Sequence, residues 1–182
     1  MKTLEIYEYL LHYSFKKIYQ TDIANFLKCS KMLVSKAIKE LEAKRIIARD
    51  TKNAVAVINP LLLASYLAFE QEQPKILYFQ APDYKDVLAV LKKTLYLISS
   101  KSAEQIKKDE EPKIITAHIL ENHLSILSKY FNQVISKEKA NLIIYPAKHI
   151  KFLTNEVIKG VNIANKWQII IDQLKENELK RY

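Results

Sequence analysis

The order of hydrophobic patterns in residues 3–58 constrains the fold more than any other feature of this sequence. Apolar residues recur at helical spacing through 3–14 and predict a first helix. A second, short helix is expected from Thr21, a typical N-cap residue, and a third at 31–45 after the N-cap Ser30. Two short β-branched runs around the polar break TKN follow, and they predict a β-hairpin.

The third predicted helix has one apolar face and one basic face. Val34, Ile38 and Leu41 recur at helical spacing and provide the apolar face. The outer face carries Lys31, Ser35, Lys36 and Lys39. The tip of the hairpin that follows carries Arg49, Lys52 and Asn53. These seven residues are the candidates for contact with a partner.

The positive charge of the chain is concentrated near this helix. The 182 residues carry a net charge of +9. Residues 1–60 hold eleven Lys or Arg against six Asp or Glu, and residues 28–52 alone hold eight against three. The excess of five in the first part therefore lies within one short segment. A basic patch confined in this way favours an anionic partner, most often nucleic acid.

Helix, short helix, tight break, basic helix and hairpin follow one another in the order of a winged helix-turn-helix. In that fold the second helix of the pair enters the major groove of DNA. A lysine-rich helix face is most often only solvated. Here, however, the lysines belong to the second helix of such a pair and adjoin a basic hairpin. We therefore expect the four outer-face residues and the three hairpin-tip residues to bind double-stranded DNA.

The segment SKMLVSKAIKELEAKRII, residues 30–47, resembles the recognition-helix segment of winged-helix transcription regulators of the MarR and related types. In those proteins a Ser or Thr, an apolar anchor, Ser-Arg/Lys and a Leu-Glu pair recur at this spacing. This chain departs from the pattern at Arg45, where such proteins usually have glycine before the wing strand. The departure concerns the local turn and leaves the expected fold unchanged.

The sequence predicts an α+β protein with two domains. Residues 61–70 are apolar on all sides, so this helix is expected to be buried in a core or against another subunit. The segment 71–74 is the best domain boundary. We expect a winged helix-turn-helix domain at 1–70 and a small mixed α/β domain at 75–182.

The second half mixes strand and helix patterns. Strands are expected at 75–79, 141–145 and 161–163, and helices at 84–98, at 114–131 and from the N-cap Asn165 onward. The charged stretch 101–112 is expected to be a solvated face or loop.

The tail from Lys159 to Leu174 resembles the end of AbiEi-family proteins, the antitoxin-regulators of type IV toxin–antitoxin systems. The motif that carries the resemblance is Trp167-Gln168 followed by Asp172 and Leu174, after a strand like NLIIYP and a Gly-Val strand. The Gly-Arg-rich ending common in bacterial members is absent. From the residues alone, Trp167 belongs to the core, while Gln168 and Asp172 lie one turn apart on a solvated helix face.

This resemblance implies a repressor of its own toxin–antitoxin operon that binds inverted repeats. The neighbouring gene would encode a nucleotidyltransferase-like toxin as the cognate partner. A two-fold operator suits a homodimer. We expect that dimer to form through residues 61–70 and the first helix.

Several kinds of catalytic and metal site are excluded. The single glycine, Gly160, excludes a standard P-loop, a GxGxxG dinucleotide loop and a GxSxG nucleophile elbow. The single cysteine, Cys29, excludes a disulfide framework and CxxC motifs. His118 and His123, predicted on one helix, are five residues apart, whereas a HExxH site needs four. We expect no enzymatic activity, no cofactor and no metal.

Two alternatives to a DNA-binding regulator remain open. The winged helix can dock a protein in place of DNA, or it can anchor a nucleic-acid-processing enzyme.

Glu5 and Glu8 interrupt the apolar pattern of the first residues, which argues against a signal peptide. No apolar run approaches the roughly 18–20 residues that span a bilayer, so a cytoplasmic protein without membrane contact is expected.

Overall fold

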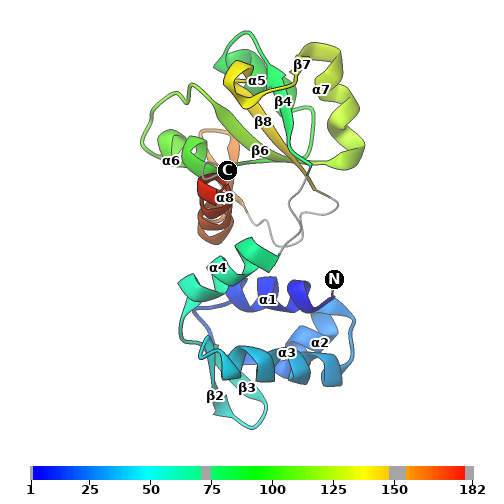
Figure 1. The fold of residues 1–182 in the computed structure, drawn as a ribbon, viewed down its shortest axis with the longest axis vertical. Coiled ribbons are helices and arrows are strands. Elements are labelled where there is room, and N and C mark those ends of the chain that lie inside the picture. The colour runs from blue at the N-terminus through cyan, green and yellow to red at the C-terminus, as the bar shows by residue number, and fades with distance from the viewer. Residues whose placement is uncertain (1, 71–74, 148–154, 179–182) are drawn as a thin grey trace. The chain divides into compact units, whose positions relative to one another are not determined.

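The fold belongs to the α+β class. The structure, a computed structural model, describes residues 2–70, 75–147 and 155–178 (Figure 1). Within these residues it contains eight α-helices, a three-stranded antiparallel sheet and a seven-stranded mixed sheet. The chain divides into two compact units, Met1–Glu72 and Gln73–Tyr182.

The first unit consists of helices and one small sheet. Its elements are α1 (Lys2–His12), β1 (Ile18–Tyr19), α2 (Gln20–Leu27), α3 (Lys31–Ala43), β2 (Ile47–Thr51), β3 (Ala54–Val57) and α4 (Pro60–Glu70). The strand order is β1-β3-β2, with both pairs antiparallel. Helix α1 packs against α2, α3 and α4 (Figure 1). The first helix, the basic helix, the hairpin and the helix at 61–70 are therefore confirmed as elements.

Two expectations about helix starts have different outcomes. The Ser30 side chain caps α3, since its Oγ accepts a hydrogen bond from the Leu33 backbone N–H at 3.2 Å. The N-cap prediction for Thr21 is wrong, because α2 begins at Gln20 and Tyr19 occupies the cap position without a side-chain bond. The reason is the unpredicted strand β1, which pairs with β3 and sets the start of α2 one residue before Thr21.

Arg45 takes the backbone conformation that a glycine would have taken. Its φ is 56°, in the left-handed region that side chains with a Cβ disfavour. An arginine in this turn between α3 and β2 therefore costs more conformational energy than a glycine would.

Helix α4 is buried on one side only. Leu63, Ala64, Leu67 and Ala68 are buried within the first unit. Leu61 and Phe69 are 57% and 61% exposed, and Leu62 is exposed as well. The prediction of an all-round buried helix is therefore wrong for the unit by itself. Burial against another subunit stays a prediction.

The second unit is built on the seven-stranded sheet. Its strands are β4 (Leu77–Gln80), β5 (Tyr96–Ser99), β6 (Ile115–Leu120), β7 (Asn132–Val134), β8 (Leu142–Ala147), β9 (Asn155–Ile158) and β10 (Val161–Ala164). Its helices are α5 (Tyr84–Leu91), α6 (Ser100–Lys107), α7 (Leu124–Tyr130) and α8 (Lys166–Glu178), with short 3-10 turns η1 (Glu121–His123) and η2 (Lys137–Lys139).

The strand order is β7-β4-β8-β6-β5-β10-β9. The pairs β6–β8 and β5–β10 are parallel, and the other pairs are antiparallel. Helix α5 packs with α7, and α6 packs with α8 (Figure 1). All residues of β5 and nearly all of β6 are buried, as expected for central strands covered on both faces.

Two expectations for this unit are wrong. The helix expected at 84–98 ends at Leu91, and the helix expected at 114–131 begins as strand β6 and becomes helical only from η1 onward. Both segments contain a short apolar run that strand pairing in the sheet core stabilises over helix. The stretch 101–112, expected to be a solvated face or loop, forms helix α6 up to Lys107, with one exposed face and one face that buries Ala103 and Ile106, and is exposed at 108–111.

Other expectations are confirmed. The strands expected at 75–79, 141–145 and 161–163 correspond to β4, β8 and β10. Asn165 caps α8, since its Oδ1 accepts a hydrogen bond from the Gln168 N–H at 3.0 Å. Among the described residues, no helix is long and apolar enough to cross a membrane.

Candidate nucleic-acid interface

The predicted site residues lie on the outer face of α3 and at the tip of the β2–β3 hairpin, and α3 carries three of the lysines. Val34, Ala37, Ile38 and Leu41 are buried and fix the inner side of the helix. At about 100° per residue, positions 32, 35, 36, 39 and 43 fall within an arc of roughly 100° on the opposite side. Ser35, Lys36 and Lys39 therefore share one face. Lys31 is exposed but lies about 100° from Met32 around the helix.

The local sequence fixes how this face is presented. Helix α2 ends at Leu27 with Lys28 in a left-handed conformation, at a φ of 50°. The N–H of Lys28 donates to carbonyls of α2 and so closes that helix. Only Lys28, Cys29 and Ser30 join α2 to α3. A connection this short, ending in the Ser30 cap, holds the first turn of α3 in a defined direction.

Neither Lys31 nor the lysines of this face are neutralised. Among the described residues, no carboxylate pairs with Lys31, Lys36 or Lys39. Lys44 differs, because its Nζ lies 2.9 Å from Glu40 Oε1 and 3.8 Å from the centre of the Tyr66 ring. The hydrogen bond from Lys44 is the main reason that the pKa of Glu40 is lowered. Glu40 thus offsets Lys44 and leaves the other three charges unopposed.

The hairpin tip contributes less than the sequence suggests. Arg49 binds Glu42 of α3 with two contacts, Nε to Oε1 at 2.8 Å and Nη2 to Oε2 at 2.9 Å. Its Nη1 also donates to the Lys52 carbonyl at 3.4 Å. Lys52 and Asn53 form the exposed turn between β2 and β3. The Arg49 side chain is therefore bound to Glu42 of α3, and Lys52 and Asn53 remain at the tip of the hairpin.

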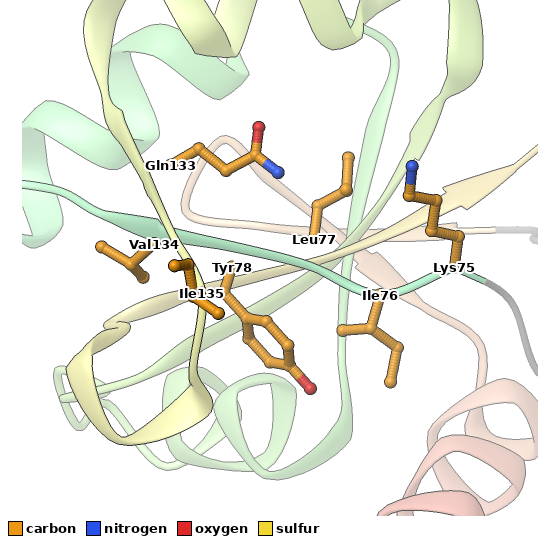
Figure 2. A pocket seen from close by; sticks show the side chains of 7 residues that line it. All are labelled: Lys75, Ile76, Leu77, Tyr78, Gln133, Val134 and Ile135. Carbon is orange, nitrogen blue, oxygen red and sulfur yellow. The ribbon is translucent and has the colours of Figure 1, made fainter.

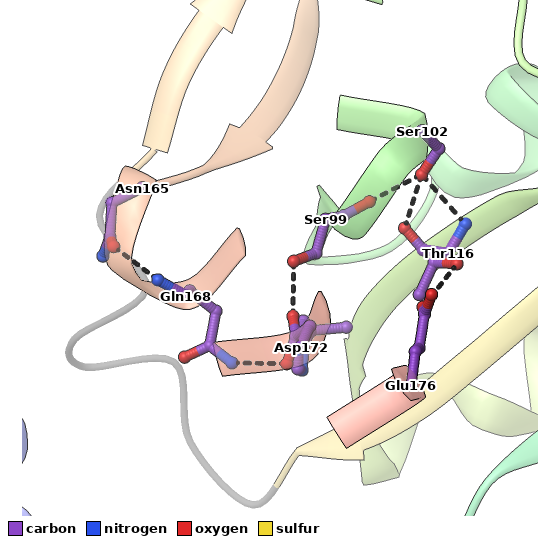
Figure 3. A network of polar contacts seen from close by, with 8 residues as sticks. Ser99, Ser102, Thr116, Asn165, Gln168, Asp172 and Glu176 are labelled. Atoms are coloured by element: carbon purple, nitrogen blue, oxygen red, sulfur yellow. Dashed lines mark hydrogen bonds and ion pairs between the residues drawn. The ribbon is translucent and has the colours of Figure 1, made fainter. Parts of the chain in front are cut away.

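A second polar cluster lies in the second unit and is buried. Asp172 on α8 is only 1% exposed. Its Oδ2 accepts hydrogen bonds from the Ser99 hydroxyl and from His118 Nε2, the latter at 2.7 Å, and its Oδ1 accepts one from Gln168 Nε2 at 2.8 Å. Figure 3 shows Ser99 and Gln168 approaching Asp172 from different elements. The expectation that Asp172 lies on a solvated face is wrong.

The surroundings of Asp172 favour its ionised form. Burial is the largest influence and raises its pKa. The charge and hydrogen bond of His118 and the hydrogen bond from Ser99 outweigh burial, so the pKa of Asp172 lies below its ordinary value. The His118 ring also stacks on Tyr145, with the ring centres 5.3 Å apart. His118 is therefore held on β6 by two partners, and it does not share a helix with His123.

The same cluster ties α6 and α8 to the sheet. Ser102 Oγ donates to the Ser99 carbonyl at 2.6 Å and accepts from the Thr116 N–H at 3.1 Å. Thr116 Oγ1 lies 3.5 Å from Glu176 of α8 (Figure 3). Ser99, Ser102 and Thr116 are buried. This arrangement fixes helix positions and offers no open surface to a substrate. Trp167 is buried nearby, as the sequence predicts.

The hollow at the β4–β7 edge has a different character. It has a volume of about 510 Å³ and is lined mainly by apolar side chains, among them Ile76, Leu77, Val134 and Ile135 (Figure 2). None of the predicted site residues lies there. Within the described part of the chain, no three His, Cys, Asp or Glu side chains are grouped so as to hold a metal ion.

Sequence reasoning missed two features of these surfaces. Met32 lies on the same face of α3 as Lys36 and Lys39, a position that helical spacing alone would have shown. The partners of Asp172 could not have been found in this way, because Ser99 and His118 are 73 and 54 residues away in the chain.

Protein-family models, curated proteins and solved structures were compared with the chain, and none of them matches it.

Proposed function

We propose that this protein is a sequence-specific, double-stranded DNA-binding transcriptional regulator. The first unit would act as a winged helix-turn-helix, with α2 and α3 as the helix pair, α3 as the recognition helix and the β2–β3 hairpin as the wing. The observation that carries the proposal is the set of unpaired lysines on α3, opposite the face that the core holds. Such a helix can enter a major groove without losing its packing.

The dimensions and charges of α3 support this assignment. Thirteen residues give α3 a length of about 20 Å, and a major groove about 12 Å wide admits a helix. Lys36 and Lys39 would contact phosphates or base edges, with Ser35 beside Lys39 as a hydrogen-bonding group. Lys31 would reach the flanking backbone. Lys52 and Asn53 would contact the duplex from the wing.

Arg49 receives a different role from the one expected from sequence. Its two-contact ion pair with Glu42 links the wing to the recognition helix. Planar two-point pairs between arginine and carboxylate fix geometry better than a lysine pair does. We propose that Arg49 positions the wing, while Lys52 supplies its charge toward DNA.

We propose that the regulator is a homodimer whose interface is centred on α4. Ile58, Leu61, Leu62 and Phe69 expose large apolar side chains along one stretch of the first unit. Exposed large apolar side chains gathered on and beside one helix favour an interaction site. The apolar side chains of α1 are buried in the core of the first unit. Helix α4 therefore offers more exposed apolar surface for a dimer interface than α1 does. A two-fold dimer would place two α3 helices on half-sites about 34–36 Å apart.

The resemblance of the tail to AbiEi-family proteins suggests which promoter to test. A member of that family would repress its own operon, which would also encode a nucleotidyltransferase-like toxin. Gln168 and Asp172, which carry part of the resemblance, interact directly in the structure. They support the fold of the second unit. The autoregulatory role rests on the resemblance alone.

The test is a fluorescence-anisotropy titration of the full chain against the duplex immediately upstream of its own gene, beside a scrambled duplex, at two salt concentrations. We expect tighter binding to the upstream duplex at both salts. Replacing Lys36 and Lys39 by Ala should weaken binding and flatten the logarithmic salt dependence by roughly one to two units of slope.

The matched control is the double variant Lys85→Ala/Lys92→Ala. It removes the same charge from exposed positions of the second unit and should leave the salt slope unchanged. Equal, weak and salt-erased binding to both duplexes would contradict the proposal. That result would favour a protein partner for the first unit.

A further inference from the structure

Met32 is the most exposed large apolar side chain on the outer face of α3. It is 81% exposed, although methionine is among the residue types most often buried. Its neighbours on the same helix, Leu33 and Val34, are half-buried and buried. No packing within the first unit therefore accounts for an apolar residue at this position.

The position of Met32 is central to the face that carries the lysines. Taking Met32 as the origin, Lys39 lies about 20° to one side around the helix and Lys36 about 40° to the other. Ser35 lies about 60° away on the Lys39 side. Met32 is also in the first turn, directly after the Ser30 cap. In helix-turn-helix proteins the first turns of the recognition helix are the part that contacts base edges.

Only one base offers an apolar group to such a side chain. In the major groove, G, C and A present hydrogen-bonding groups, whereas T adds the C5 methyl group. With α3 in the groove, the flanking lysines would pair with phosphates and Met32 would face the base edges. The thioether chain is flexible and polarisable, which suits it to a methyl contact.

We propose that Met32 is a specificity-determining residue that contacts the C5 methyl group of a thymine in the operator. The proposal rests on DNA binding through α3 and adds which base the helix recognises. Lys36 and Lys39 hold the helix on the backbone, and Met32 distinguishes thymine from bases without a methyl group. The residue is positioned by the Ser30 cap and by the short α2–α3 connection.

The experiment replaces the thymines of the upstream duplex one at a time by deoxyuracil, which lacks only the methyl group. Each duplex is titrated with the wild type, with Met32→Ala and with Met32→Leu. We expect one or two positions in each half-site where the wild type binds about fourfold more weakly, the effect of losing one buried methyl contact.

At those positions Met32→Ala should bind the thymine and deoxyuracil duplexes equally, and Met32→Leu should keep a preference for thymine. The control Leu95→Ala removes an exposed apolar side chain from the second unit and should behave as the wild type. Thermal unfolding of Met32→Ala should match the wild type, because the side chain has little burial to lose.

The outcomes separate the two proposals. If the wild type does not prefer the upstream duplex to the scrambled one, the proposal of sequence-specific DNA binding by α3 is contradicted. The inference about Met32 is then contradicted as well. If the wild type prefers the upstream duplex but no deoxyuracil position weakens binding, only the role of Met32 is overturned. The same holds if Met32→Ala keeps the wild-type sensitivity at every position.

Discussion

Replacing Asp172 by Ala should destabilise the second unit strongly. The carboxylate accepts hydrogen bonds from Ser99, His118 and Gln168, and both Ser99 and His118 are buried. Without it, these two donors are left without their partner, at about 1–3 kcal/mol each. We expect a loss of about 3–5 kcal/mol, the range for removing one partner from a buried charged pair.

The single tryptophan makes this loss measurable in one unit alone. Trp167 is buried on α8, five residues before Asp172, and is the only Trp in the chain. Its fluorescence during urea titration therefore reports on the second unit. The control Glu104→Ala removes an exposed carboxylate from α6 and should change stability by less than about 0.5 kcal/mol.

The effect should also depend on pH, with a defined sign. The pKa of Asp172 is lowered in the folded protein, so its ionised form stabilises the fold above the unfolded pKa of about 3.9. That contribution is lost as the pH falls through the pKa that Asp172 has in the folded protein. The difference between wild type and Asp172→Ala should therefore shrink below about pH 4. A difference under about 1 kcal/mol at neutral pH, or one that grows on acidification, would refute the reasoning.

Two further predictions concern the first unit. Arg45→Gly should raise the stability of the first unit by about 0.5–1 kcal/mol, because glycine relieves the left-handed strain at a smaller entropic cost. Far-UV circular dichroism during heating measures the unfolding midpoint, and a midpoint below that of the wild type would contradict the prediction. Leu61→Glu/Phe69→Glu should convert a dimer into a monomer of 21.2 kDa in size-exclusion chromatography with light scattering. A wild type that is already monomeric would disprove the interface on α4.

Local patterns predicted the first unit well, because its elements are specified by neighbouring residues. The buried face of α3 follows helical spacing, and Ser30 caps the helix that begins one residue later. The hairpin needs only two β-branched runs and a polar turn. Strand β1 was missed because two residues, Ile18 and Tyr19, are too few to form a pattern.

The second unit was harder because its strands depend on distant partners. Ile115–Leu120 contains four apolar residues beside Thr116 and His118, and so short a segment does not by itself separate a buried helix from a strand. Pairing with both β5 and β8 decides the matter, and neither partner is visible in the segment itself. Asp172 illustrates the same limit, since a charged residue on a helix is usually solvated. Its burial depends on Ser99 and His118, which come from β5 and β6.

The strand order has a consequence for synthesis on the ribosome. One edge of β5 pairs with β6, its neighbour in the chain, but the other edge pairs with β10, which is translated after β8. All elements of the first unit lie within residues 2–70, and units of this kind can fold as they emerge. A nascent chain that stalls before β10 therefore combines a complete first unit, α3 included, with a second unit in which one edge of β5 is unpaired. Such a chain would be a target for chaperones and proteases, so the supply of active protein would depend on translation reaching α8.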